Sequence, residues 1–95
     1  MKSLQPRAYI IEPTGAEWER LPDNGRAFTL QEMQDAVGGF IEVLFLGPQR
    51  VVLNEHGKLD GLPINPKATE RFAQHLVPGD YLVGPVLVCE SRMIE

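Results

Sequence analysis

Apolar and polar residues alternate along the 95-residue chain in short runs that glycine and proline separate. Four of these runs are rich in β-branched and aromatic residues and predict strands: residues 8–12, 40–46, 50–54 and 81–89. The short Gly-Pro connection at 47–49 predicts that the second and third strands form a hairpin. Gly84 and Pro85 interrupt the last run, which predicts a bulge or an edge position there.

The first full helix is predicted by its cap residues. Thr29 and Glu32 have the spacing of a capping box, in which each side chain accepts a hydrogen bond from the backbone N–H of the other. An apolar face at helical spacing follows and is expected to be buried: Leu30, Met33 and Val37. The two glycines at 38–39 predict a left-handed end to this helix.

A second helix is predicted to begin at Pro66, with Asn65 as its N-cap. Proline is well tolerated at the first helical position, because that residue has no intrahelical use for its N–H group. Pro78 and Gly79 are expected to end this helix.

The capping-box spacing of Thr14 and Glu17 predicts only a helical turn after the first strand. The element order is then β-α-β-β-α-β, which is typical of the ferredoxin-like fold. We therefore expect an α+β fold in which a four-stranded, mainly antiparallel sheet carries two helices on one face. An α+β fold with another strand order is the alternative. Residues 1–95 are expected to form a single domain whose ends, 1–7 and 91–95, are frayed.

Composition narrows the class of protein. A net charge of −4 and a pI near 5.1 disfavour a nucleic-acid partner, and no run approaches the ~20 apolar residues of a membrane span. Cys89 is the only cysteine, so an intrachain disulfide is excluded and a reducing cytoplasm is the expected location. The apolar residues around Cys89 predict a buried structural thiol rather than a nucleophile.

No motif for catalysis, metal binding or a cofactor stands out, so we expect no cofactor and no enzyme. The one candidate binding site that the sequence suggests is an anion site at the start of the second helix, where free N–H groups and the helix dipole favour negative charge. Lys67 and Arg71 lie on the first turns of that helix, and Lys58 is expected to approach from the preceding turn.

Nine positions are the candidates for contact with a ligand or partner, and they are Trp18, Glu55, His56, Lys58, Asp60, Leu62, Asn65, Lys67 and Arg71. Trp18 suits either a clamp over the sheet edge or a stacking platform for a ligand. Glu42 interrupts an otherwise apolar strand face. Either that face is partly solvated, or Glu42 has a partner, or Glu42 belongs to a site.

Three segments resemble an uncharacterised family that occurs mainly in bacteriophages and mobile elements and is known only as a domain of unknown function. They are LQEMQDAVGGFIEVLFL at 30–46, VVLNEHGKLDGLPINPKAT at 51–69 and GDYLVGPVLVC at 79–89. The resemblance implies a phage or prophage origin. It implies no reaction, and no catalytic residue follows from it.

Two functions are expected as alternatives. The first is a small cytoplasmic binding module from a phage or mobile element, which acts stoichiometrically on a host protein in counter-defence or regulation. It is expected to form a homo-oligomer, because apolar residues on both faces of 40–46 exceed what one helical layer covers. The second is a protein that sequesters a nucleotide or similar small anion at the start of the second helix.

Overall fold

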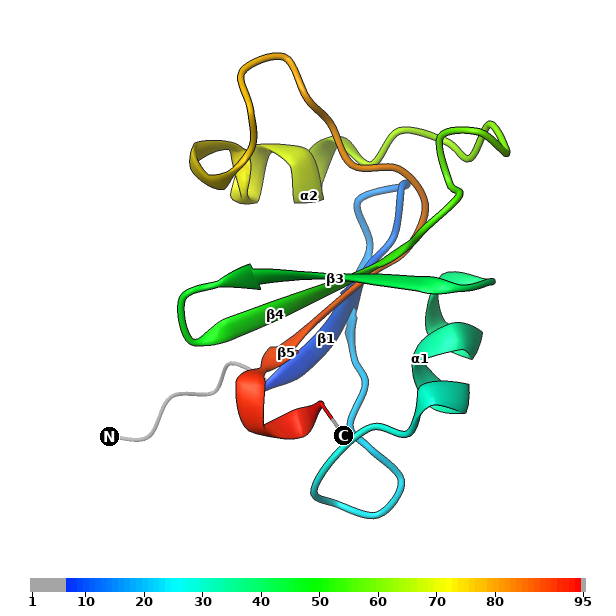
Figure 1. Cartoon of the computed structure of the whole chain (residues 1–95), viewed down its shortest axis with the longest axis vertical. Helices are drawn as coiled ribbons and strands as arrows, with labels where there is room; N and C mark the ends of the chain where they lie inside the picture. Colours follow the sequence, from blue (N-terminus) through cyan, green and yellow to red (C-terminus); the bar gives the residue numbers. More distant parts are fainter. Residues whose placement is uncertain (1–6, 95) are drawn as a thin grey trace.

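In the computed structural model of the chain, residues 7–94 are described and form a five-stranded antiparallel sheet with two α-helices (Figure 1). The strands are β1 Ala8–Ile11, β2 Glu17–Glu19, β3 Ile41–Leu46, β4 Gln49–Asn54 and β5 Val86–Glu90. The helices are α1 Leu30–Val37 and α2 Pro66–Arg71, with 3-10 turns at η1 Ala73–His75 and η2 Ser91–Met93. The strand order across the sheet is β2-β1-β5-β4-β3.

The last strand, β5, lies at the centre of the sheet between the β1–β2 and β3–β4 hairpins. It pairs antiparallel with β1 on one side and with β4 on the other. Its residues from Val86 to Cys89 are all buried, as expected for a strand that is covered on both faces. Gly84 has a φ of 72°, so the chain turns just before β5, and the strand expected over 81–89 is confined to its second half.

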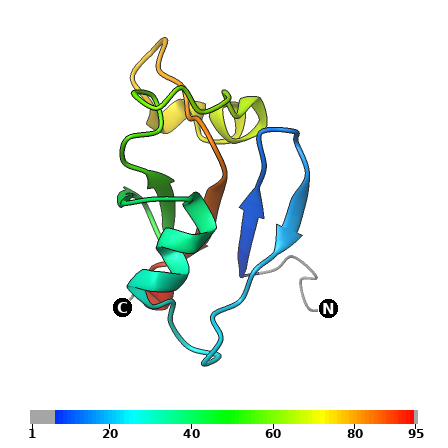
Figure 2. The ribbon, with the colours of Figure 1, turned by 90° about the vertical axis from the view of Figure 1, so that its right-hand side faces the viewer.

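Side chains alternate along the strands between two apolar cores, one on each face of the sheet. Helix α1 covers one face with Met33 and Val37, and α2 covers the opposite face with Ala68 and Phe72 (Figures 1 and 2). The strand residues of the α1-side core are Ala8, Ile10, Val52, Leu87 and Cys89. Those of the α2-side core are Ile11, Val51, Val86 and Val88. Strands that are apolar on both faces therefore require one helical layer on each side.

The expected ferredoxin-like arrangement was wrong in the number of strands, in their order and in the placement of both helices on one face. The difference begins at residues 12–16. There the N–H of Gly15 donates to the carbonyl of Glu12, and the N–H of Glu12 donates to the carbonyl of Ala16, which makes a hairpin turn. The added strand β2 reverses the chain before α1, so β5 lies between β1 and β4 and is antiparallel to both.

The helical turn predicted from Thr14 and Glu17 is absent from the described chain, because both side chains are used differently. The Thr14 hydroxyl accepts from Ala16 N–H within the turn, and the Glu17 carboxylate binds Lys67 and Arg71 of α2. The backbone of 17–19 pairs with β1. Tertiary contacts here override a local helix-start signal.

The caps predicted for the first helix are confirmed. The Thr29 hydroxyl accepts from the N–H of Glu32 at 3.1 Å, and the Glu32 carboxylate accepts from the N–H of Thr29 at 2.8 Å. Gly38 ends α1 with a φ of 80°, and its N–H donates to the carbonyl of Gln34. Leu30, expected on the buried face, is 55% exposed, because it lies in the first turn, ahead of the residues that pack on the sheet.

The chain ends agree only in part with the expected fraying. Residues 1–6 and 95 lie outside the described residues, and Arg7 is exposed. Residues 91–94, however, are docked against the α1-side core. Met93 is buried there and its carbonyl accepts from the N–H of Phe28 at 2.7 Å, while Ile94 forms a parallel bridge with Phe28. Apolar burial together with this backbone pairing fixes the end that was expected to be loose.

Asn65 is confirmed as the N-cap of α2, and it is the one fully buried polar residue among residues 7–94. Its Oδ1 accepts from the N–H of Ala68 at 3.1 Å, which caps the helix. Its Nδ2 donates to the carbonyls of Ile11 in β1 and Gly84 before β5, both at 2.9 Å. One carboxamide thus joins the start of α2 to two segments of the sheet and satisfies its own buried polar atoms.

We expect Asn65→Ala to lower the free energy of unfolding by about 3 kcal/mol, because it removes a cap and leaves two buried carbonyls without a donor. Asn65→Asp keeps the cap acceptor but brings a carboxylate against the same two carbonyls, so it should destabilise at least as much at pH 7. Urea unfolding measures both changes.

The matched control for this pair is Asn24→Ala, in an exposed turn where the side chain accepts from two N–H groups. It should cost less than about 1 kcal/mol. Wild-type stability of Asn65→Asp at pH 7 would contradict the role given to the two donated bonds.

Candidate functional site

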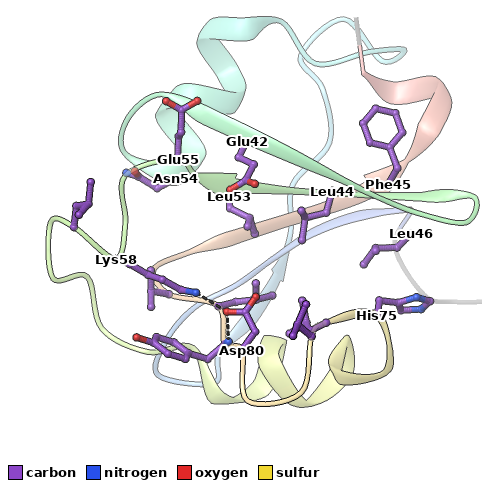
Figure 3. Close-up of a pocket in the computed structure, with 16 residues that line it drawn as sticks. Glu42, Leu44, Phe45, Leu46, Leu53, Asn54, Glu55, Lys58, His75 and Asp80 are labelled. Atoms are coloured by element: carbon purple, nitrogen blue, oxygen red, sulfur yellow. Dashed lines mark hydrogen bonds and ion pairs between the residues drawn. The ribbon is translucent and has the colours of Figure 1, made fainter.

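A groove of about 500 Å³ lies on the α2 side of the sheet, between strands β3 and β4 and the segment from η1 to residue 83 (Figure 3). Its inner lining is aliphatic: Leu44, Leu46, Leu53, Leu76 and Leu82. Exposed apolar side chains stand at its rim: Leu59, Val77 and Tyr81. Charged or titratable side chains complete the rim: Glu42, Glu55, Lys58, His75 and Asp80.

The outer wall of the groove is a loop that hydrogen bonds hold against α2. After η1, Pro78 and Gly79 turn the chain, and the N–H of Asp80 donates to the carbonyl of Val77 at 2.8 Å. The N–H of Leu82 then donates to the Thr69 hydroxyl at 2.9 Å, and the Leu82 carbonyl accepts from the N–H of Asn65 at 2.8 Å. The wall is therefore anchored at its far end by Thr69 of α2 and by Asn65, the residue that caps this helix.

Glu42 points into the groove from β3 (Figure 3). Its side chain shares a sheet face with Leu44 and Leu46, and it is exposed. Of the three possibilities left open for this residue, partial solvation is the one observed, and Glu42 also lines the groove. An acidic group beside an aliphatic lining gives this end of the groove a negative charge.

An ion pair between Lys58 and Asp80 crosses one end of the groove (Figure 3). The hydrogen bond from Lys58 lowers the pKa of Asp80 and, reciprocally, raises the pKa of Lys58. The Lys58 Nζ also lies 4.4 Å from the centroid of the Tyr81 ring, which is a cation–π contact. This pair joins the turn after β4 to the outer wall and defines where the groove ends.

Two of the basic residues expected to attract an anion, Lys67 and Arg71, lie outside the groove and are already paired. Arg71 donates two hydrogen bonds to Glu17, at 2.9 and 2.8 Å, and Lys67 Nζ lies 2.8 Å from the same carboxylate. These bonds, that from Arg71 first, lower the pKa of Glu17 to about 2. Lys67 also donates to the carbonyl of Gly15, so the cluster fastens α2 to the β1–β2 hairpin.

The remaining candidates are dispersed over the surface. His56 lies 3.4 Å from the carboxylate of Glu55 and meets the Phe40 ring edge-on. Asp60 is exposed in a turn. Of the nine candidate residues, the groove brings together two, Glu55 and Lys58.

Leu62 and Trp18 have structural surroundings. Leu62 lies against the Cα positions of Gly57 and Gly84, where an added Cβ would come within 3.3 and 2.8 Å of its Cδ1. The Trp18 Nε1 donates to Glu12 at 3.0 Å from the edge strand β2, and the indole is half-exposed. Its position at the sheet edge suits the clamp that was one of its two expected roles.

Sequence reasoning missed the aliphatic lining and the whole outer wall of the groove. The signal that could have found them was the combination of an acidic residue on an apolar strand face with apolar residues in a loop. Glu42 supplied the first part, and Val77 and Tyr81 beside Pro78-Gly79 supplied the second. Because the candidates were chosen largely for their charge, they included residues that form ion pairs within the fold.

Among residues 7–94, no three His, Cys, Asp or Glu side chains converge in a way that suits a metal ion. No helix there is long and apolar enough to cross a membrane. Cys89 is buried, as predicted, and burial raises the pKa of its thiol to about 11, far from the range of a reactive thiolate.

Comparison with known protein families gives a match. The model of a family described as a domain of unknown function (DUF3846) matches residues 6–93, nearly the whole chain. No curated protein and no solved structure matches the chain.

We expect Glu17→Gln to lower the free energy of unfolding at pH 7 by about 1 kcal/mol, because Lys67 and Arg71 lose a shared, partly exposed carboxylate. The pKa of Glu17 is about 2 in the fold against an ordinary 4.5. Its stabilisation is therefore complete above pH 4.5 and is lost as the pH falls towards 2.

Urea unfolding at a series of pH values measures this difference between wild type and Glu17→Gln. Glu19→Gln removes the same charge from the same strand and is the matched control. A difference for Glu17→Gln that stays constant down to pH 2 would contradict the pairing with Lys67 and Arg71.

Proposed function

Because the chain belongs to the DUF3846 family of domains of unknown function, we propose its function from its own groove: it is a binding module that holds a polypeptide segment of a partner protein there. The preferred segment carries a large apolar side chain next to a lysine or arginine. The module acts by binding to its partner protein and catalyses no reaction.

The observation that carries this proposal is the gathering of exposed apolar side chains around the groove. Leu59 is 86% exposed and Val77 is 73% exposed, and Tyr81 stands beside them. Exposed large apolar residues that gather around a polar-rimmed hollow are typical of interaction sites, whereas single ones need no explanation. The aliphatic lining provides a place where an apolar side chain of the partner loses contact with water.

Charge selects among possible segments. Glu42 and Glu55 stand at the rim, and Lys58 is neutralised by Asp80. The rim is therefore acidic, in keeping with the net charge of −4. A basic residue beside the apolar anchor would be attracted, and an acidic one would be repelled.

The resemblance to a phage and mobile-element family supplies the biological part of the proposal. A compact acidic module from such an element would bind a host protein one-to-one in the cytoplasm, in counter-defence or in regulation. The alternative of sequestering a nucleotide or other small anion at the start of α2 has less support. Lys67 and Arg71 are already bound to the Glu17 carboxylate, and Asn65 caps the helix N–H of Ala68.

The proposal predicts what a displayed library of short random peptides selects with the wild-type protein: peptides with a large apolar residue beside lysine or arginine. Val77→Asp should weaken the selected peptides about tenfold, because a carboxylate replaces apolar surface that the peptide covers. Fluorescence polarisation with a labelled peptide measures the dissociation constant.

Leu30→Asp is the control, since Leu30 is also exposed but lies on α1, across the sheet. Its affinity should equal that of wild type. In a bacterial lysate, the true partner is then the protein that Leu30→Asp retains and Val77→Asp loses. Selection of acidic peptides, or an equal loss of peptide affinity in both variants, would show that the groove is not the binding site.

A further inference from the structure

The two edges of the sheet differ in how well they are protected against pairing with another strand. The β2 edge is three residues long and carries glutamate at two of them, Glu17 and Glu19. The β3 edge, Ile41–Leu46, is six residues long, contains no proline and has Glu42 as its one charge. Long, apolar, uncharged edges are the ones that accept a further strand, and short charged edges resist it.

The pairing of β3 with β4 determines which backbone groups of β3 remain open. In an antiparallel pair, alternate residues exchange both backbone hydrogen bonds with the residue opposite. The carbonyl of Phe40 accepts from the N–H of Glu55, so the even-numbered residues of β3 point their N–H and C=O groups towards β4. The groups of Ile41, Val43 and Phe45 then point to the open edge.

We propose that this edge binds a second copy of the chain, strand β3 against strand β3, antiparallel about a two-fold axis at Val43. In that register Val43 of one copy lies opposite Val43 of the other, and Ile41 lies opposite Phe45. Every outward N–H and C=O from Ile41 to Phe45 then has a partner. A shift by two residues either way leaves part of this edge unpaired or sets it against the connections that flank the strand.

The side chains of β3 complement one another in the same register. On the α1 side of the sheet, Phe45, which is 72% exposed, lies opposite Ile41 of the second copy. Phe40, which precedes β3 and is 65% exposed, lies opposite Leu46 of the second copy. The two most exposed aromatic residues of this segment thus each meet an aliphatic partner, and apolar cross-strand pairs stabilise a sheet.

Charge also permits this pairing. Glu42, the one charged residue of β3, lies opposite Leu44 of the second copy and not opposite a like charge. The Arg50 guanidinium stacks over the Phe45 ring at 4.3 Å, on the α1 side and away from Glu42. An arbitrary strand would have to supply its own matched apolar pattern, whereas a second copy carries one already.

The two-fold axis stands perpendicular to the sheet, so both grooves lie on the same face of the dimer and flank the axis. The hydrogen bonds of the dimer come from the outward backbone groups of β3, and they form whether or not a peptide occupies the groove. A dimer that binds no peptide would overturn the proposed function alone. A monomer that binds peptide would overturn this inference alone.

Sedimentation equilibrium of the wild-type protein first tests its oligomeric state. The expected mass is twice the 10.6 kDa of the chain, and a monomer at every concentration up to the solubility limit would overturn the proposal. Phe45→Lys should raise the dimer dissociation constant about tenfold or more. The Phe45–Ile41 pair occurs twice in the dimer, because of the two-fold axis, and both pairs are lost. Leu30→Lys, exposed on α1, is the control and should leave the constant unchanged.

Cross-linking tests the register without relying on loss of function. Val43→Cys brings two thiols to opposite positions about 5.5 Å apart between Cα atoms, which suits a disulfide. Mild oxidation should give a covalent dimer. Leu46→Cys is the control: in this register its two copies are about 20 Å apart and should not cross-link. Cys89 is buried in both variants. Equal cross-linking of the two variants, or none with Val43→Cys, would overturn the register.

Discussion

The arrangement of this protein depends on the buried carboxamide of Asn65. Its three hydrogen bonds join the first turn of α2 to the end of β1 and to the turn before β5. Two further bonds fix Leu82 beside it: the Asn65 N–H donates to the Leu82 carbonyl, and the Leu82 N–H donates to the Thr69 hydroxyl. Because both ends of the segment 65–82 are held at this point, the residues between them fold over the sheet as the outer wall of the groove.

Local signals predicted the elements that local bonds stabilise. The capping box of Thr29 and Glu32, the glycine end of α1 and the Asn65 cap all depend on neighbours within a few residues. The tertiary arrangement was harder to predict from the sequence. In the β1–β2 hairpin, Glu17 is bound by Arg71, 54 residues away, and the backbone of its strand pairs with β1. Once this hairpin reverses the chain, the strand order and the positions of both helices change with it.

The same reasoning explains why the candidate site was predicted only in part. Charged residues attract attention in a sequence, but in the fold Lys67 and Arg71 share Glu17, and Lys58 pairs with Asp80. These pairs fasten elements together. The groove is instead made largely of leucines that lie partly buried on the second core, which are indistinguishable from core residues along the chain. Glu42 was the one position whose sequence context indicated the right face.

Binding of a polypeptide in the groove can be located residue by residue. Amide chemical shifts of ¹⁵N-labelled protein, recorded during titration with a library-selected apolar-basic peptide, report where the peptide lies. We expect the largest changes at Leu44, Leu46 and Leu76 and along the outer wall up to Leu82, with residues 66–71 unchanged. Changes centred on Lys67 and Arg71, with a silent groove, would contradict groove binding and favour an anion site at the start of α2.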